Sequence, residues 1–432
     1  ITYTYDAAGS KLKKTTTENN ATVDGFTTDI TTTTTYTGGA VYESKTYSHA
    51  SLSGKNQPEK LLFMGMEEGR IRIRETDNTF QYDYMLKDHL GNVRMVLTDE
   101  LKTDMYIAAT LEPETITEEE KYYDNLSSTQ YDKPSWFSDP LYSSGNTKVA
   151  QLKNTTGVQK IGPSILLKVM AGDSYNVRVA SGWNSGSTAT NSTPNVLTDL
   201  FNALTTGLAG VSGGKASSIQ LAGSSSGLNS GLTTFLSNQP TSGSRPKAYL
   251  NWIVFDEQFK IVSTASGSDP VGASGVTKIH TPPTVTIPKN GYLYIYTSNE
   301  ATNIDVFFDN LLVTHTRGPI LEETHYYPFG LAQQGISSKA LTGNAENKFG
   351  FGAKELQSTE FTDGTGLDQY DFSARTYDPQ IGRMLQIDPW VDKYERQSPY
   401  VAFNDNPIIF ADPTGKGGIL TVVKNDDGTW HL

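Results

Sequence analysis

The chain contains no cysteine among its 432 residues. This excludes disulfide bonds and thiolate metal sites, but it leaves the compartment open, because many secreted bacterial proteins also lack cysteine. No window approaches the roughly 18 consecutive apolar residues of a transmembrane helix, so we expect no membrane span in this chain. Charged residues are scarce at 19%, and 35 basic against 47 acidic residues give a net charge of −12. Because the basic residues form no patch, nucleic acid is not an expected partner.

Common cofactor-binding spacings are missing as well. The six histidines are far apart in the sequence, without the His-x-x-x-His or His-Glu-x-x-His spacing that indicates zinc. No Gly-x-x-x-x-Gly-Lys segment is present to bind phosphate. The sequence therefore predicts no required cofactor, and an enzyme that acts on other molecules is the least favoured class of function.

Residues typical of strands and turns are abundant. The chain has 23 Tyr, 17 Phe and 39 Gly, and 36% of its residues are hydrophobic. Aromatic residues favour pleated, half-buried surfaces, and Gly favours the turns between strands. A chain of this length can form two or three packed units. We therefore predict a mainly β, multidomain protein. Because Ile1 opens within a patterned strand, we also expect the chain to be part of a longer protein.

The first hundred residues read as short strands separated by turns, which predicts β-hairpins in series. One Thr-rich stretch, 27–37, ends at Gly38-Gly39. Two other segments, 5–12 and 87–94, place an Asp and a Gly between flanking Tyr, Leu or Val. Asp and Gly form the turn, while the flanking residues pack on a neighbouring hairpin.

The most specific motifs lie near the C-terminus. The run Tyr370–Pro389 contains two Asp-Pro pairs, and Asn406-Pro407 and Asp412–Gly415 follow it. With segments 5–12 and 87–94, this series resembles the core signature of RHS/YD-repeat proteins, which are large secreted shells ending in a variable, often toxic piece. The resemblance implies a β-hairpin shell segment closed by a C-terminal core domain, and a bacterial protein that is secreted or lies at the cell surface. It also implies encapsulation and delivery of a C-terminal effector domain of the same polypeptide.

A large insertion interrupts the expected order of these motifs. In the family, the Asp-His-Leu-Gly-Asn-Val-Arg segment, here 88–94, normally lies close to a His-Tyr-Tyr-Pro-Phe-Gly segment, here 325–330. Domain insertion is tolerated at exposed hairpin tips whose ends lie close together. The resemblance therefore divides the chain into a shell segment at 1–103, an inserted domain at 104–318, and the shell continuation with the core domain at 319–432.

The inserted part has strand-like runs, several of them alternating, which predict a β-sandwich. Its ends resemble those of carbohydrate-binding jelly rolls. Apolar residues at helical spacing predict two short helices, one starting at Thr193-Pro194 and one around Leu228–Leu236, joined by the Gly/Ser-rich loop 209–231. The strand-like runs are 165–169, 175–179, 248–255, 284–287, 292–296 and 304–313.

The C-terminal motifs also carry the candidate catalytic residues. RHS core domains resemble aspartic proteases in mechanism, because carboxylates near their Asp-Pro motifs catalyse cleavage of the chain just after the last Asp-Pro-x-Gly. The resemblance makes Asp388 the first candidate carboxylate, and Asp412 either its partner or the residue that frames the scissile bond. The cut is expected shortly after Gly415. Arg383 is the candidate to hold a carboxylate by a bidentate contact, with Arg375 on the adjacent strand as the alternative.

Two departures from cleaving relatives accompany this pattern. Trp390-Val391 follows the inner Asp-Pro in place of Gly-Leu, and Lys416 replaces the usual hydrophobic residue. Asp before Pro is also a common turn starter, because Pro makes the preceding residue extended and the Asp caps nearby N–H groups. The sequence is therefore compatible both with self-cleavage and with a purely structural turn. If the chain is an enzyme, we expect self-cleavage to be its activity.

The jelly-roll resemblance implies a structural calcium ion as the one candidate metal. Glu112 or Glu114 together with Asp309 would hold it, since hard oxygen ligands from two terminal strands suit calcium. Solvated carboxylates at strand ends are the alternative. Aromatic residues of the insert, such as Trp136 and Trp183, could stack on sugars or fill the core. A second class of function is therefore a cell-surface interaction protein whose inserted sandwich binds a glycan or a protein ligand.

Overall fold

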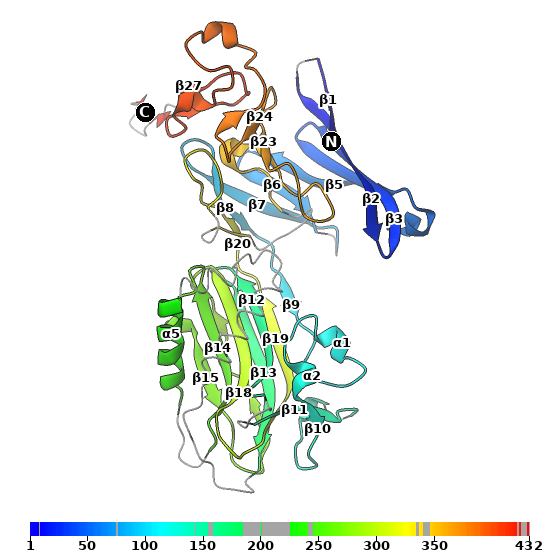
Figure 1. Ribbon diagram of the computed structural model, residues 1–432, viewed down its shortest axis with the longest axis vertical. Coiled ribbons are helices and arrows are strands. Elements are labelled where there is room, and N and C mark those ends of the chain that lie inside the picture. Colours follow the sequence, from blue (N-terminus) through cyan, green and yellow to red (C-terminus); the bar gives the residue numbers. More distant parts are fainter. Residues whose placement is uncertain are drawn as a thin grey trace. The chain divides into compact units, whose positions relative to one another are not determined.

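The computed structural model confirms a mainly β protein. It describes residues 1–432 except 8, 75–76, 143, 154–158, 185–199, 201–224, 241–244, 334–336, 340–345, 421–422, 425–429 and 432. Packing divides the chain into two compact units (Figure 1): unit 1 comprises Ile1–Glu100 and Ile320–Leu432, and unit 2 comprises Leu101–Pro319. The limits expected from sequence, 103/104 and 318/319, lie a few residues away from these. No helix in the described part of the chain is long and apolar enough to cross a membrane.

Unit 1 is built on a ten-stranded antiparallel sheet in which consecutive strands are neighbours, as the hairpin pattern predicts. After unit 2, the chain re-enters this sheet on the free edge of β8, where Ile320 pairs with Leu97 and Glu323 with Met95. The strands, in spatial order, are β1 (Thr2–Tyr5), β2 (Lys11–Val23), β3 (Phe26–Thr37), β4 (Ala40–Tyr47), β5 (Gln57–Met66), β6 (Gly69–Ile73), β7 (Phe80–Lys87), β8 (Val93–Thr98), β20 (Ile320–Glu323) and β21 (Ser338–Lys339).

The two Asp-Gly segments form the same kind of turn. The carbonyl oxygen of Asp6 accepts from the N–H of Gly9, and that of Asp88 accepts from the N–H of Gly91. Both glycines have positive φ, 86° and 80°, which a residue with a Cβ adopts only at a cost. Not every strand is short, however. β2 and β3 have 13 and 12 residues, because their Thr-rich pattern meets no Gly or Pro before the turns.

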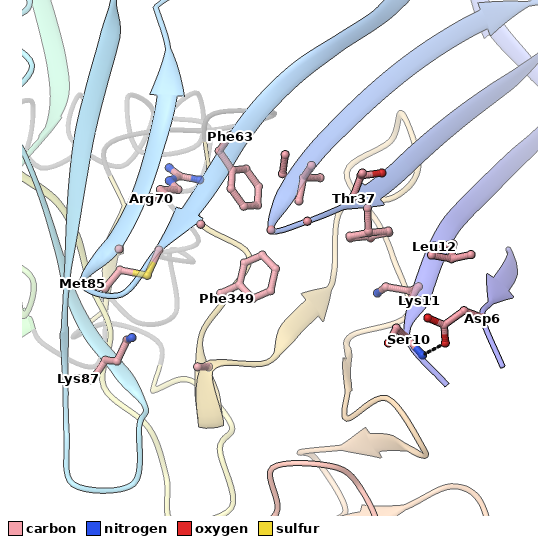
Figure 2. Close-up of a pocket in the computed structure, with 18 residues that line it drawn as sticks. Asp6, Ser10, Lys11, Leu12, Thr37, Phe63, Arg70, Met85, Lys87 and Phe349 are labelled. Atoms are coloured by element: carbon pink, nitrogen blue, oxygen red, sulfur yellow. Dashed lines mark hydrogen bonds between the residues drawn. The ribbon is translucent and has the colours of Figure 1, made fainter. Parts of the chain in front are cut away.

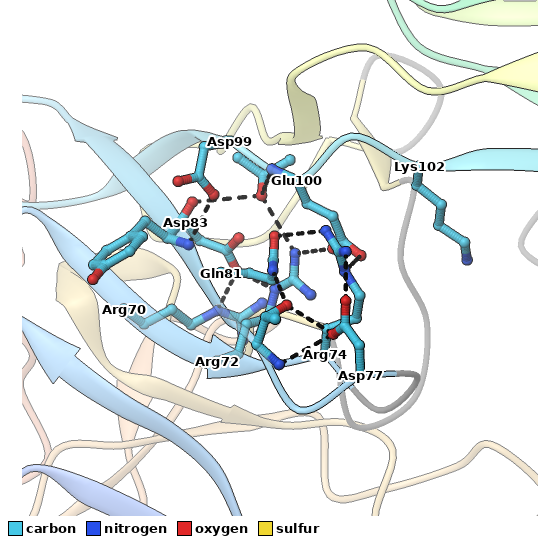
Figure 3. Close-up of polar contacts among 12 residues, drawn as sticks. Arg70, Arg72, Arg74, Asp77, Gln81, Asp83, Asp99, Glu100 and Lys102 are labelled. Atoms are coloured by element: carbon cyan, nitrogen blue, oxygen red, sulfur yellow. Dashed lines mark hydrogen bonds and ion pairs between the residues drawn. The ribbon is translucent and has the colours of Figure 1, made fainter.

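A buried ion-pair network lies on one face of this sheet (Figure 3). Arg70 and Arg72 each place Nε on the same carboxylate oxygen of Asp83, at 2.9 and 2.7 Å. Arg72 also reaches Glu100 at 2.6 Å, and Arg74 reaches the same Glu100 at 3.2 Å. Buried charges persist in a fold only when they are paired in this way.

The C-terminal part of unit 1 packs around an aromatic cluster. Phe351, Tyr370, Phe372, Tyr377 and Phe403 are all at most 4% exposed and contact one another. Tyr370 and Tyr377 lie on small strands, whereas Phe351 and Phe403 lie in short 3₁₀ turns. The small strands β22 (Glu355–Gln357), β23 (Gln369–Asp371), β24 (Thr376–Asp378) and β25 (Arg383–Met384) form one four-stranded sheet, and β26 (Phe410–Ala411) with β27 (Ile419–Leu420) and β28 (Val423–Lys424) with β29 (Trp430–His431) form two pairs. Short 3₁₀ turns at Phe351–Ala353, Val391–Lys393 and Phe403–Asp405 connect them.

Unit 2 is a β-sandwich whose two antiparallel sheets enclose one apolar core. The strand-like runs expected from the sequence all overlap its strands, although run 284–287 is a strand only at Val285–Thr286 and run 304–313 begins before β19. The first sheet contains β10 (Gln130–Asp132), β11 (Lys148–Leu152), β19 (Val306–Thr316), β13 (Ser174–Trp183) and β16 (Lys278–His280), with β9 (Thr103–Met105) and β17 (Val285–Thr286) paired alongside. The second contains β12 (Ile161–Val169), β18 (Gly291–Asn299), β14 (Ala248–Asp256) and β15 (Gly267–Pro270).

The helices of unit 2 are short. α1 (Ile116–Glu119) and α2 (Leu126–Thr129) precede the first long strands, and α5 spans Ser225–Ser237. The helix predicted at Leu228–Leu236 is thus present, and Leu228 and Leu232 are buried against the second sheet. The loop predicted at 209–231 is wrong from residue 225 onward, because this apolar spacing extends the helix into the Ser-rich segment. The helix predicted from Thr193 lies outside the described residues apart from Leu200.

Candidate functional site

The C-terminal motifs meet at the guanidinium group of Arg375. Its Nη2 lies 3.0 Å from Oδ2 of Asp388 and 3.2 Å from Oδ2 of Asp412. Its Nε donates to the carbonyl oxygen of Gly415 at 2.6 Å, and its Nη1 donates to that of Val401 at 3.3 Å. Arg375, Asp388 and Asp412 are at most 3% exposed. One buried cation therefore joins both candidate carboxylates to the backbone at the expected cleavage position.

Asp412 shapes the turn that contains the expected cut. Its Oδ1 accepts from the N–H groups of Gly415 at 2.7 Å and Lys416 at 3.1 Å, and its Oδ2 accepts from Gly417 at 3.2 Å. Gly415 has a φ of 73°, and a Cβ there would lie 2.6 Å from the carbonyl oxygen of Phe372. This position therefore requires glycine.

Asp388 is held less completely. Its Oδ1 accepts from the N–H of Trp390 at 2.8 Å, which closes the turn that Asp-Pro predicts. Its Oδ2 is buried and forms the ion pair with Arg375, but the angles do not make that contact a hydrogen bond, and no other described residue donates to this oxygen. This buried oxygen therefore has spare capacity to accept a hydrogen bond from a water molecule.

Arg383 does not join this cluster. It is partly exposed on β25, and its Nη1 pairs with Oδ1 of Asp405 at 2.9 Å. The carboxylate-holding position is occupied by Arg375, the alternative on β24's side of the hairpin. The sequence alone could not distinguish the two arginines. In the structure, Arg383 lies opposite Asp378 in the pairing of β24 with β25, away from the aspartates that Arg375 contacts.

A cavity of about 720 Å³ opens beside Arg375. It is lined by polar and aromatic side chains from the N-terminal strands and by the turn that follows Asp412. Lys354 lies near the same turn, since its Nζ donates to the carbonyl oxygen of Pro413 at 2.6 Å, and burial lowers its pKa. Residues lining the cavity include Tyr3, Tyr5, Lys11, Asp371, Arg375, Gln386, Pro413, Thr414 and Lys416.

A second cavity in unit 1, of about 650 Å³, is mainly apolar (Figure 2). Phe63 and Phe349 meet in it edge to face, with ring centroids 5.9 Å apart. Two of its cations have carboxylate partners, because Arg70 pairs with Asp83 and Lys11 pairs with Glu355. The positive charges of Arg70 and Lys11 are therefore already neutralised by carboxylates. A preformed anion site would instead offer positive charges that no carboxylate neutralises.

In unit 2, the structure does not gather the three candidate calcium ligands into one group among the described residues. Asp309 is buried on β19, and burial raises its pKa to about 8, with Asp139 and Glu112 adding to the rise. Glu112 accepts from the backbone N–H groups of Thr147 at 2.6 Å and Lys148 at 2.8 Å. Glu114 is exposed on the surface. The described residues contain no group of three or more acidic or histidine side chains gathered for a metal.

Two residues that hydrogen-bond to Asp309, Asn146 and Asn310, each carry a buried side-chain amide oxygen. Asn146 donates its Nδ2 to Asp309 at 2.7 Å, and the N–H of Asn310 donates at 2.8 Å. The Oδ1 atoms of Asn146 and Asn310 are buried and accept from no described residue. Carboxylate and amide oxygens are the ligands that calcium prefers, so we expect a calcium ion in unit 2 to lie at Asp309 rather than at the exposed Glu114.

An aromatic cleft of about 570 Å³ lies on the outer face of the first sheet of unit 2. Phe307 contacts Tyr131, with ring centroids 6.2 Å apart, and Trp136 edge to face at 6.0 Å. Tyr131 is 48% exposed, so one ring face is available at the surface. Carboxylates and amides complete the lining, namely Asp132, Gln151, Asn184, Asn303 and Asp305.

One constellation was not predicted from the sequence. Ser181, His280 and Asp269 form a hydrogen-bonded chain across the two sheets of unit 2. Ser181 and His280 are both 0% exposed, which leaves the hydroxyl no access to a substrate. The three residues come from β13, β16 and β15, and no sequence spacing connects them. This chain of contacts is therefore a polar link within the core.

Comparison with known proteins adds limited information. No family model matches the chain. Salivary gland surface protein 1 of Aedes aegypti is 31% identical over 135 residues, which are 31% of this chain and 4% of that protein. This chain therefore spans a small part of that relative's length.

Solved structures of two xylanase modules are similar in part. The C-terminal family 22 carbohydrate binding module of Clostridium thermocellum Xyn10B has a TM-score of 0.21 and 9% identity, covering 43% of this chain and 84% of that one. The CBM22-1–GH10 modules of the same enzyme, complexed with xylohexaose, have a TM-score of 0.20 and 9% identity, covering 44% and 26%. At these TM-scores, the likeness carries no argument about function.

Proposed function

We propose that the C-terminal part of unit 1 cuts its own chain at the Gly415–Lys416 bond. The observation that carries this proposal is the position of Arg375, whose guanidinium group contacts Asp388, Asp412 and the carbonyl oxygen of Gly415 at once. Hydrolysis of an amide needs a base for water, a donor to the carbonyl oxygen and an acid for the leaving nitrogen. Each requirement has a candidate group in this cluster.

The reaction requires that the two carboxylates carry one proton between them, as in a carboxylate pair. Asp388 takes a proton from a water molecule as the water oxygen bonds to the carbonyl carbon of Gly415. Arg375 donates to the carbonyl oxygen, where negative charge develops. The C–N bond then breaks, and Asp412 delivers its proton to the nitrogen of Lys416. In the intact chain, Oδ1 of Asp412 accepts from the N–H of this nitrogen at 3.1 Å, so the step requires Oδ1 to become the donor once the nitrogen is pyramidal. The products are the carboxyl group of Gly415 and the amino group of Lys416.

The surroundings of the bond support this chemistry. Lys416 and Arg375 both line the 720 Å³ cavity, which offers a route for water. The substrate is part of the same chain, so it is present at a high effective concentration and one turnover is enough. We further propose that this cut releases a C-terminal effector from an RHS-type shell, to which unit 1 contributes the closing segment.

Intact mass spectrometry of the purified chain tests the proposal. We expect the wild-type chain to lose residues 416–432 with time, and the Asp388→Asn variant to be slower by at least about 100-fold, the usual contribution of a positioned acid or base. Asp378→Asn is the matched control, because Asp378 also precedes Pro but only caps the N–H of Gln380. Equal cleavage in the Asp388→Asn variant would remove Asp388 from the mechanism.

A second candidate function concerns unit 2, and the aromatic cleft at Tyr131, Trp136 and Phe307 favours it. An exposed aromatic ring can stack on the apolar face of a sugar ring, and the carboxylate and amide groups beside it can hydrogen-bond to the sugar hydroxyl groups. We propose that this cleft binds a glycan, which would make the chain a cell-surface interaction protein.

A glycan array probed with the whole chain tests this second function. We expect binding that falls at least about fivefold in the Tyr131→Ala variant, since a stacked ring contributes on the order of 1 kcal/mol or more. Tyr122→Ala is the control, because Tyr122 is 51% exposed in the same unit and does not line the cleft. Binding that is equal in both variants would exclude the cleft.

A further inference from the structure

The N-terminal strands of unit 1 are joined to β22 and β23 by buried ion pairs. Nζ of Lys11 lies 2.6 Å from Oε2 of Glu355 and 2.6 Å from Oδ2 of Asp371. Nζ of Lys14 lies 2.9 Å from the other oxygen of Glu355, and the hydroxyl group of Tyr36 lies 3.0 Å from both. These contacts hold together segments more than 300 positions apart in the chain. Lys11 and Glu355, for example, are separated by 344 positions.

Glu355, Lys11 and Lys14 are charged in the folded protein. Burial alone would raise the pKa of Glu355, but the charges of Lys14 and Lys11 outweigh it and bring the pKa to about 2. Burial would likewise lower the pKa of Lys11, yet Glu355 and Asp371 raise it overall. Removing one partner of such a buried pair leaves an uncompensated charge, so the remaining groups must move or admit water.

Asp371 connects this ion-pair cluster to Arg375. Its Oδ1 accepts from the N–H of Ser373 at 2.7 Å, while its Oδ2 receives Lys11. The N–H of Phe372 then donates to the carbonyl oxygen of Arg375 at 3.0 Å. Ser373 sits in the left-handed region with a φ of 71°, so this tight turn depends on the contacts that hold it.

The same strands form one wall of the cavity at the proposed cleavage site. Tyr3, Tyr5 and Lys11 line it on the N-terminal side, and Arg375 and Lys416 line it on the C-terminal side. The first two strands of the chain therefore do more than extend the sheet, since they complete the space from which water would reach the bond.

We propose that Lys11 is a positioning residue for the self-cleavage, acting through Asp371 on the turn that carries Arg375. Cleavage then depends on the docking of the β1–β2 hairpin and begins only after this N-terminal part of unit 1 has folded onto the C-terminal part. This inference rests on the proposed function, and it adds a control of that activity by a segment remote in sequence.

The test compares cleavage rates of the full 432-residue chain by intact mass. We expect Lys11→Met to slow cleavage about tenfold or more, because a displacement of about 1 Å at a reacting group can cost this much. Lys11→Arg retains the charge and is expected to restore most of the rate. Lys13→Met is the matched control, since Lys13 is an exposed lysine on the same strand. Thermal unfolding and circular dichroism verify that each variant is folded at the assay temperature.

The outcomes separate the two ideas. No cleavage in the wild-type chain overturns the proposed function and this inference with it. Wild-type cleavage that proceeds at the same rate in the folded Lys11→Met variant overturns the positioning role alone. A slow Lys11→Met variant that Lys11→Arg rescues, with Lys13→Met unchanged, supports it.

Discussion

The hydroxyl oxygen of Ser181 lies 2.7 Å from Nε2 of His280 in the core of unit 2. On the other side of the ring, Nδ1 lies 2.7 Å from Oδ2 of Asp269. The neutral imidazole satisfies both neighbours, because the hydroxyl group donates to Nε2 and the Nδ1–H donates to the carboxylate. This link joins β13 and β16 of one sheet to β15 of the other.

His280 makes the stability of unit 2 sensitive to acid. Burial lowers its pKa even though Asp269 favours the charged form. The unfolded chain, with an ordinary histidine pKa of about 6.5, then binds the proton more readily than the folded one. Its contribution to stability is present above about pH 6.5 and is lost as the pH falls below that value. We expect the thermal midpoint of the wild type, relative to that of His280→Gln, to fall between pH 8 and pH 5. A difference that is independent of pH would contradict this.

Calcium is expected to stabilise unit 2 through Asp309. Because the pKa of this buried carboxyl is raised to about 8, the folded protein binds a proton there, and a cation must compete with it. Calcium chloride should therefore raise the thermal midpoint more at pH 9 than at pH 6, and Asp309→Asn should abolish the response. Glu114→Gln should retain it, since Glu114 is exposed. A wild type that responds equally to magnesium would argue against a calcium-selective site.

Loss of Asp83 should severely destabilise unit 1. Its carboxylate is 0% exposed and carries both Arg70 and Arg72, so Asp83→Ala leaves two buried arginines without this counter-charge. We expect a cost of about 3–5 kcal/mol in the free energy of unfolding, measured by urea denaturation. Asp77→Ala, which removes an exposed partner of Arg74, should have little effect. Similar costs for the two variants would show that the buried network contributes no more than a surface pair.

Gly415 is expected to tolerate no side chain. Its φ of 73° and the 2.6 Å approach of a Cβ to the Phe372 carbonyl oxygen both oppose Gly415→Ala. Gly364→Ala is a suitable comparison, because Gly364 has a φ of 80° but nothing within 4 Å of its Cβ position. The Gly364 variant should lose only about 1–2 kcal/mol from backbone strain, and the Gly415 variant should lose clearly more. Equal losses in urea denaturation would mean that the turn relaxes without cost.

Local features of the fold followed from the sequence. The turns at Asp6 and Asp88, and the strands β3, β12, β13, β14, β18 and β19, lie where residue pattern and turn chemistry predict them. Alternation of apolar residues and the special φ of glycine act over a few positions, so they can be read locally. The error at 225–231 has the same origin, since a Ser- and Gly-rich segment is read as loop until a packed apolar face makes it helical.

The candidate site was only partly accessible to such reasoning. Asp388 and Asp412 were selected by resemblance to a known signature, and the structure brings both to one guanidinium group. The choice between Arg375 and Arg383 depended on strand register, and the link from Lys11 to Asp371 had no signal in the sequence at all.

The sequence by itself determined that this protein is mainly β, where many of its strands and turns lie, and which two aspartates to examine. Only the tertiary structure showed that Arg375 contacts both aspartates and that Asp309 is buried. It also showed that the first two strands line the cavity beside the Gly415–Lys416 bond. The reason is physical: strand and turn formation depends on neighbouring residues, whereas burial, ion pairing and a shared cavity depend on groups that approach one another only when distant segments pack.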